Sequence, residues 1–189
     1  RQLEKVARIS DRYQMMMHDL NASLREASTL DSLTGIANRR LLTERLREES
    51  ERAKRYARPL TLVMLDIDRF KVINDEHGHE VGDRVLIEVV RVMEAEIREQ
   101  DLCGRWGGEE FLIVMPECTA QTAWAVMRRL GDSIAALGVR VNDELLGVTA
   151  SMGVAELHLD ETYSSTINRA DIALLRAKRS GRNRCELSE

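Results

Sequence analysis

The sequence predicts a layered α+β or α/β domain, in which helices cover a mixed sheet, preceded by a long helix. Strand-like apolar runs alternate with helical stretches along the chain, and two segments have the pattern of β-hairpins. With 189 residues, 43% of them hydrophobic, the chain has enough apolar side chains for one buried core and an additional element.

Residues 1–28 predict a helical stalk. They contain no Pro or Gly, and apolar or small residues recur at spacings of three and four, at Leu3, Val6, Ser10, Tyr13, Met17, Leu20, Leu24 and Ala27. This seam of about four heptads favours a coiled coil that joins two chains into a homodimer. The alternative is one amphipathic helix packed on its own domain. The run of methionines at 15–17 also suits a docking surface for a regulatory protein, because methionine repacks easily.

A turn-rich break at 31–38 begins the globular domain, residues 29–189, and Asn38 is placed to cap the first helix. The elements then expected are a helix from Arg39 to about Tyr56, a buried strand at 60–65, a helical stretch at 70–75, a long helix to about 97, a hairpin around 107–108, a helix at about 120–137, a second hairpin formed by 139–141 and 147–155, a helix at about 165–179, and a short strand near Cys185.

Composition excludes several classes of protein. A net charge of −4 argues against non-specific nucleic-acid binding, and no apolar run approaches the ~20 residues that cross a bilayer, so this fragment is expected not to contact membrane. The three cysteines are widely spaced and form no zinc or disulfide pattern, which fits a reducing cytoplasm. Because the chain begins without Met inside a helical pattern, we expect an upstream sensor or membrane region.

The segment 105–111, Arg-Trp-Gly-Gly-Glu-Glu-Phe, is the most informative. A Gly-Gly pair between apolar runs predicts a tight hairpin, because glycine reaches the positive φ angles of primed turns. A backbone without side chains also lets a ligand approach closely. Glu109 and Glu110 would then lie at the tip, where carboxylates bind hard divalent cations. The alternative is a solvated acidic turn.

Asp66 and Asp68 follow the apolar strand, and buried carboxylates are costly unless they are paired or bound to metal. Beside the hairpin they predict a Mg²⁺ site, although Asp68 is as well suited to capping the next helix. Asn74, with Asp75 and Asp83, offers an amide and carboxylates for the edge of a guanine, and otherwise serves as a cap or surface residue.

Lys178 and Arg182 lie four positions apart near the C-terminus. One interpretation is a solvated basic end of a helix. The other is that these residues supply the positive charge that a bound triphosphate requires.

Six segments, 31–40, 65–75, 78–83, 105–111, 151–155 and 177–184, resemble the motifs of GGDEF-domain diguanylate cyclases in order and spacing. The resemblance covers about residues 29–187 and leaves out the stalk. It implies a nucleotidyl-cyclase-like palm with a central, mostly antiparallel sheet. It also implies condensation of two GTP molecules into cyclic di-GMP and two pyrophosphates.

The resemblance assigns roles residue by residue. Two Mg²⁺ ions per site, or Mn²⁺, are expected on Asp66, the Ile67 carbonyl and Glu109, with Glu110 as the partner of Lys178 and a further metal contact. Asn74 and Asp83 are expected on guanine, and Phe70, Lys71, Lys178 and Arg182 at the phosphates. The catalytic set is then Asp66, Glu109, Glu110 and Lys178.

Each chain would supply half of the reaction centre, so two domains would face each other antiparallel. The stalk would raise their local concentration. Arg98-Glu99-Gln100-Asp101 resembles the family's inhibitory product site, nine positions before Gly107, with Arg129 as an additional candidate. The alternative for Arg98 and Asp101 is a surface ion pair.

Two residues depart from the family pattern: Leu175 replaces a common aromatic residue and Cys185 a common Val, both read as packing changes. Two other functions stay open. One is a catalytically silent module that binds GTP or cyclic di-GMP, against which the complete carboxylate set argues. The other is a cyclase with a mixed purine product.

Overall fold

The structure is a computed structural model that describes residues 14–17 and 29–189 of the chain. Gln14–Met17 is helical, and its three methionine side chains are exposed. The remainder of the predicted coiled-coil stalk lies outside the described residues, so the stalk stays a prediction.

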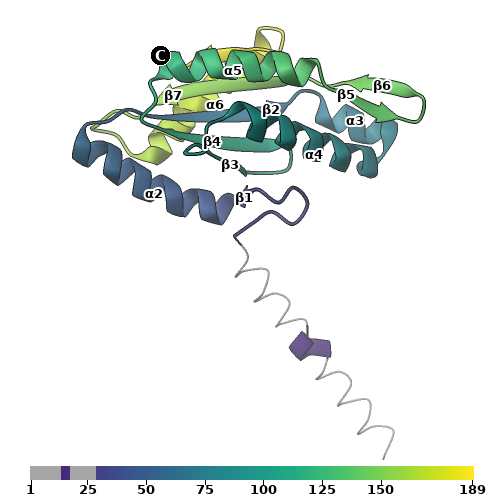
Figure 1. Cartoon of the computed structure of the whole chain (residues 1–189), viewed down its shortest axis with the longest axis horizontal. Coiled ribbons are helices and arrows are strands. Elements are labelled where there is room, and N and C mark those ends of the chain that lie inside the picture. Colours follow the sequence, from purple (N-terminus) through teal and green to yellow (C-terminus); the bar gives the residue numbers. More distant parts are fainter. Residues whose placement is uncertain (1–13, 18–28) are drawn as a thin grey trace, which may run out of the picture.

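Thirteen elements follow in the described part of the chain (Figure 1). In chain order they are β1 (Ala37–Asn38), α2 (Arg39–Tyr56), β2 (Leu60–Ile67), α3 (Phe70–His77), α4 (His79–Glu96), β3 (Leu102–Arg105), β4 (Glu110–Pro116), α5 (Ala120–Ala135), β5 (Gly138–Val141), β6 (Glu144–Gly147), β7 (Ala150–Glu156), α6 (Tyr163–Arg179) and β8 (Cys185–Leu187). No helix among the described residues is long and apolar enough to cross a membrane.

The predicted α+β fold is confirmed. Six strands form one sheet in the order β1-β3-β4-β2-β7-β8. The outer pairs β1–β3 and β7–β8 are parallel, and the three inner pairs are antiparallel, so the sheet is mixed and mostly antiparallel. β2 lies between β4 and β7 and is buried along its whole length, which explains its continuous apolar sequence.

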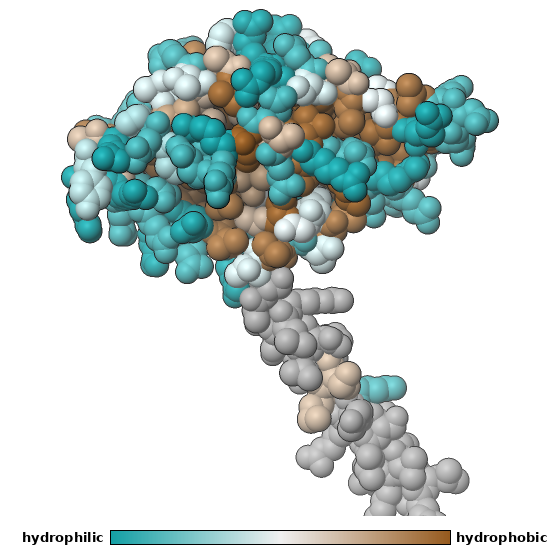
Figure 2. All heavy atoms as spheres, viewed as in Figure 1, coloured by the Kyte–Doolittle hydropathy of each residue, from teal (hydrophilic) through white to brown (hydrophobic). Residues whose placement is uncertain are grey.

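Side chains alternate between two cores, one on each face of the sheet. Leu62 and Met64 of β2 pack in the layer that contains residues of α2 and α6, whereas Val63 and Leu65 pack with residues of α4 and α5. Because successive strand residues face opposite sides, Asp66 continues the row that faces α6. The face seen in Figure 2 is covered mainly by hydrophilic residues, with hydrophobic patches between them.

Capping side chains determine where two of the helices begin. Asn38 accepts hydrogen bonds from the backbone of Arg40 and Leu41, as predicted, and fixes the start of α2. Thr162 accepts from the backbone of Ser165, so α6 begins at Tyr163, slightly earlier than expected.

The predicted second hairpin is wrong in its pairing. β5 pairs with β6, which ends at Gly147, and the residues after it form β7, which joins the main sheet between β2 and β8. The turn between β5 and β6 consists of Asn142 and Asp143, and Asn142 has φ 53°, the left-handed conformation that short hairpins require. β7 is buried over most of its length, which suits the interior of the sheet.

α6 approaches β7 so closely that only glycine fits at position 153. A Cβ atom there would overlap the carbonyl oxygen of Ala170 and the amide nitrogen of Leu174, both backbone atoms of α6. The last turn of α6 carries Lys178, so this contact also sets the position of that side chain.

We expect Gly153→Ala to lower the free energy of unfolding by about 3 kcal/mol, because backbone atoms cannot move aside as a side chain can. Urea unfolding measures the loss. Gly147→Ala is the matched control, since a Cβ at Gly147 meets nothing within 4 Å. Equal stability of the two variants would contradict the close contact between α6 and β7.

Candidate active site

The predicted carboxylates meet at the end of β2. Asp66 lies opposite Glu110 of β4 on one side and Ser151 of β7 on the other. The Ile67 N–H donates to the Glu109 carbonyl oxygen at 3.3 Å. The sheet therefore brings the hairpin carboxylates beside Asp66, although they are more than forty positions away in the sequence.

The glycine hairpin is confirmed, but the reason given for its glycines is wrong. Neither Gly107 nor Gly108 has a positive φ, because residues 106–109 form a longer loop than a primed two-residue turn. The N–H groups of Trp106 and Gly107 both donate to the Glu110 carbonyl oxygen, at 2.9 and 3.2 Å. A Cβ at Gly108 would meet nothing within 4 Å, so the loop leaves open space beside the carboxylates.

Arg105 and Asp31 hold this hairpin in place through hydrogen bonds and an ion pair, a role that the sequence did not predict. Arg105 donates to the Gly108 carbonyl oxygen through Nε and Nη2, at 3.0 and 2.8 Å, and Nη1 contacts Oδ1 of Asp31 at 3.2 Å. Burial raises the pKa of Asp31, but hydrogen bonds from Thr34 and the charge of Arg105 outweigh it and lower that pKa overall. Both residues lie in motif segments, 31–40 and 105–111, and only the fold shows that they touch.

Lys178 forms an ion pair with Asp66, with Nζ 2.9 Å from Oδ2. The Asp66 side chain is only 9% exposed. The pKa of Asp66 is raised to about 6. Burial is the largest cause, the Lys178 ammonium opposes it, and the charges of Glu109 and Glu110 add to the rise. The resemblance implied Glu110 as the partner of Lys178. The structure instead pairs Lys178 with Asp66, since a buried charge gains most from a counter-charge.

These donors are of the kind that bind a divalent cation only together with other ligands. No group of three or more Asp, Glu, His or Cys side chains forms a ready metal site within the described residues. Mg²⁺ commonly takes one or two carboxylates and fills its other positions with phosphate oxygens and water. Asp66 and Glu109, with the Ile67 carbonyl, supply this kind of partial site.

Asn74 lies where α3 packs on α4, the helix that carries Asp83. Asn74 Oδ1 is buried and has no hydrogen-bond partner among the described residues. Gly82 of α4 packs against it, and a Cβ at Gly82 would overlap this oxygen. Asp83 follows Gly82 and is exposed. A buried acceptor without a partner is costly, which marks Asn74 as a position for an external donor.

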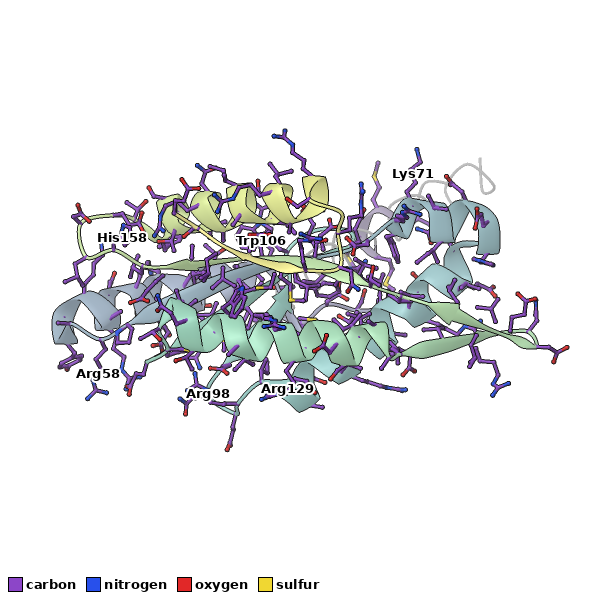
Figure 3. The ribbon with its side chains drawn as sticks, turned by 90° about the horizontal axis from the view of Figure 1, so that it is seen from above. Arg58, Lys71, Arg98, Trp106, Arg129 and His158 are labelled. Carbon is purple, nitrogen blue, oxygen red and sulfur yellow. The ribbon has the colours of Figure 1, made fainter. Side chains whose placement is uncertain are left out.

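The remaining predicted substrate residues border this region. Phe70 is buried at the start of α3, and Lys71 is exposed and projects outward (Figure 3). Arg69 precedes α3 with φ 56° and makes no capping hydrogen bond through its side chain, so the first N–H groups of α3 are open to an anion. Arg182 follows α6, is exposed, and has φ 64°.

Asp68 does not cap α3, because Arg69 occupies the cap position. The Asp68 carboxylate instead accepts hydrogen bonds from Thr149, Ser151 and the backbone of Asn183.

At the predicted inhibitory site, Arg98 pairs with Asp101 through Nη2 and Oδ1 at 2.9 Å. The two line a cleft of about 260 Å³ beside β3. Arg129 pairs with Glu96 at 2.6 Å and does not line this cleft. In the view of Figure 3, Arg98 and Arg129 project at one edge of the domain, and Lys71 at the opposite edge.

Of the two departures from the family pattern, Cys185 is a packing position, since it is buried in the core. Leu175 is not, because its side chain is 44% exposed. That part of the interpretation is wrong: the helical stripe containing Leu175 faces away from the sheet.

A mixed sheet whose central strand ends in a buried carboxylate, next to a glycine hairpin with two more, defines a palm domain of the nucleotidyl-cyclase type. The chain belongs to the family described as diguanylate cyclase, GGDEF domain, whose profile matches residues 28–184.

Similar proteins carry the same domain. Diguanylate cyclase DgcP of Pseudomonas aeruginosa (strain PAO1) is 36% identical over 99% of this chain. The crystal structure of diguanylate cyclase SiaD of Pseudomonas aeruginosa, in complex with its activator SiaC, is 60% identical with a TM-score of 0.83 and covers 100% of this chain and 72% of that chain. The coiled coil and GGDEF domain of DgcB from Caulobacter crescentus, in complex with c-di-GMP, is 28% identical with a TM-score of 0.83 and covers 100% of both chains.

This chain is shorter than its curated relatives. It spans 30% of DgcP and 52% of a diguanylate cyclase of Vibrio cholerae that is 38% identical over 88% of this chain.

The metal-free protein should lose stability as pH rises between about 4 and 6. In the folded protein the pKa of Asp66 is raised from 3.8 to about 6. The stability that Asp66 contributes is therefore complete below pH 3.8 and is lost as the pH rises through 6. Asp66→Asn removes this loss. The stability of the variant relative to the parent should therefore rise by on the order of 2 kcal/mol between pH 4 and pH 7.

Urea unfolding in EDTA measures this difference, with Asp75→Asn, on the exposed surface of α3, as the matched control. Parallel pH curves for the parent and Asp66→Asn would show that Asp66 is not held in its neutral form by burial.

Proposed function

We propose that this chain condenses two molecules of GTP into cyclic di-GMP and two pyrophosphates. The observation that carries the proposal is the buried Asp66–Lys178 pair beside Glu109 and Glu110, in a chain of the diguanylate cyclase family. The carboxylates and the basic residues Lys178 and Arg182 are all present, whereas a module that only binds nucleotide can lose its metal ligands. The complete set argues against the alternative of a silent regulatory module.

Asp66, Glu109 and the Ile67 carbonyl would hold the divalent cations, Mg²⁺ or Mn²⁺, with Glu110 beside them. When bound, the two ions would favour the attacking 3′-oxygen and neutralise charge at the α-phosphate and the leaving pyrophosphate. Lys178 adds positive charge to the same cluster of carboxylates.

We assign guanine recognition to two acceptors, one on α3 and one on α4. The edge of guanine presents neighbouring donors, N1–H and the N2 amino group, and the Asn74 Oδ1 and Asp83 carboxylate accept from such groups. Adenine lacks this pair of donors, so the arrangement favours GTP over ATP and argues against a mixed purine product. Phosphates would lie at the open start of α3, near Phe70 and Lys71, with Arg182 contributing charge.

Assembly of the whole protein is part of the proposal. Each chain would contribute one GTP-loaded half-site, and the stalk, residues 1–28, would join two chains. SiaD, which matches this entire chain, was crystallised with its activator SiaC. Exposed Met15, Met16 and Met17 make the stalk of this chain a suitable docking surface for a regulatory protein.

We place the domain in the cytoplasm, where GTP is supplied and buried thiols such as Cys103 stay reduced.

Product inhibition is proposed at the cleft of Arg98 and Asp101. The guanidinium suits phosphate and guanine contacts, and the fully buried Asp101 carboxylate holds it in place. Cyclic di-GMP is present in the DgcB structure. Arg129 would join only after exchanging its contact with Glu96.

The test is product formation from GTP with Mg²⁺, in parallel with Glu109→Ala. We expect cyclic di-GMP from the parent and a loss of at least about a hundredfold in the variant, because a metal ligand contributes several kcal/mol. Glu51→Ala, an exposed residue of α2, is the matched surface control. Adding ATP tests for a mixed product. No product from the parent, even at high protein concentration, would favour the binding module.

A second variant tests nucleotide recognition. Gly82→Ala should raise the KM for GTP at least about tenfold, because the new methyl group displaces the Asn74 side chain. Gly131→Ala on α5 is the matched helical control, since a Cβ there meets only the flexible end of Met152. The same KM in both variants would remove Asn74 from the guanine site.

A further inference from the structure

Asp68 is a buried carboxylate that the proposed chemistry does not use. Its side chain accepts a hydrogen bond from Ser151 Oγ at 2.7 Å on one oxygen. The other oxygen accepts from Thr149 Oγ1 at 2.7 Å and from the Asn183 N–H at 3.0 Å. The Asp68 N–H in turn donates to the Thr149 carbonyl oxygen at 2.9 Å. Asp68 thus joins the ends of β2 and β7 to the loop after α6.

That loop has an unusual backbone. Gly181, Arg182 and Asn183 follow one another with φ of 111°, 64° and 46°. Two of the three carry side chains, and such residues adopt left-handed conformations only where their surroundings impose them. The Arg182 N–H donates to the Ala177 carbonyl oxygen at 3.0 Å, which closes the end of α6. The next N–H, that of Asn183, is held by Asp68.

We propose that Asp68 is a positioning residue for Arg182. Its carboxylate fixes the loop 181–183 in the left-handed conformation and so sets the place from which Arg182 contacts the phosphates of the nucleotide. The inference rests on the proposed function, which assigns Arg182 to those phosphates. Strained backbone of this kind gathers at ligand sites, where a fixed geometry is needed before the ligand arrives.

The role depends on an acceptor and not on charge. The Asn183 N–H can only donate, whereas the hydroxyl groups of Thr149 and Ser151 can donate or accept. An amide at position 68 keeps one oxygen for Asn183, and a rotated Ser151 hydroxyl can accept from its NH₂ group. Asp68→Asn should therefore hold the loop, and Asp68→Ala should release it. A metal-binding carboxylate would behave differently, because the amide would lose the charge.

The experiment is a double-mutant cycle with Arg182→Ala, read as kcat and KM for GTP. We expect Asp68→Ala to raise the KM about tenfold with a smaller change in kcat, and Asp68→Asn to stay within about twofold of the parent. In the Arg182→Ala background, Asp68→Ala should add nothing further, because both changes remove the same phosphate contact.

A readout without nucleotide or metal accompanies the cycle. Trypsin should cut after Arg179 and Arg182 faster in Asp68→Ala than in the parent or in Asp68→Asn, as followed by mass spectrometry. Should thermal melting show that Asp68→Ala is unfolded at the assay temperature, Asp68→Ser takes its place, because serine is too short to reach the Asn183 N–H.

Three results would overturn the inference, and they separate it from the proposed function. Fully additive effects on KM would show that Asp68 acts independently of Arg182, while the proposed function stands. Equal losses of kcat in Asp68→Asn and Asp68→Ala would make Asp68 a charged participant. An unchanged KM in Arg182→Ala would remove Arg182 from the phosphate site, and with it that part of the proposed function.

Discussion

The ion pair between Asp66 and Lys178 is the interaction on which the site depends. A carboxylate at the end of a strand buried between two others loses most of its hydration, and burial alone would keep it protonated at acidic pH. The positive charge of Lys178, in the last turn of α6, opposes this effect of burial. The close packing of α6 on the backbone of β7 at Gly153 helps to place Lys178 within reach of Asp66. A packing contact in the core therefore contributes to the electrostatics of the site.

A second set of contacts connects the site with the start of the domain. Arg105 holds the carbonyl oxygen at the hairpin tip and, with its remaining nitrogen, Asp31 in the turn that follows the predicted stalk. The guanidinium of Arg39, at the start of α2, stacks on Trp106 of the same loop at 4.4 Å. Residues 31–39 are therefore linked by direct contacts to the loop that carries Glu109 and Glu110. These contacts connect the start of the domain with the proposed metal ligands.

Local sequence was a good guide where a single segment determines its own structure. The start of α2 follows from Asn38 as its cap, and the burial of β2 follows from its unbroken apolar run. Prediction failed where the partner was distant. Residues 147–155 were predicted as one strand of a hairpin, but Ala150–Glu156 pair with β2, and this partner could not be inferred from the strand itself. For Asp68 the sequence left a metal ligand and a helix cap equally open, because its three hydrogen-bond donors are more than eighty positions away.

The residue types that the proposed chemistry needs can be recognised in the chain before it is folded: the carboxylates, the glycine loop and the basic residues occur as short motifs, and their composition limits what they can bind. How these residues pair is visible only in the folded domain. Lys178 meets Asp66 and not Glu110, Arg129 meets Glu96 and not Asp101, and Asp68 holds the Arg182 loop. The reason is that pairing depends on distance and burial, which arise when separate segments pack together and which no single segment encodes.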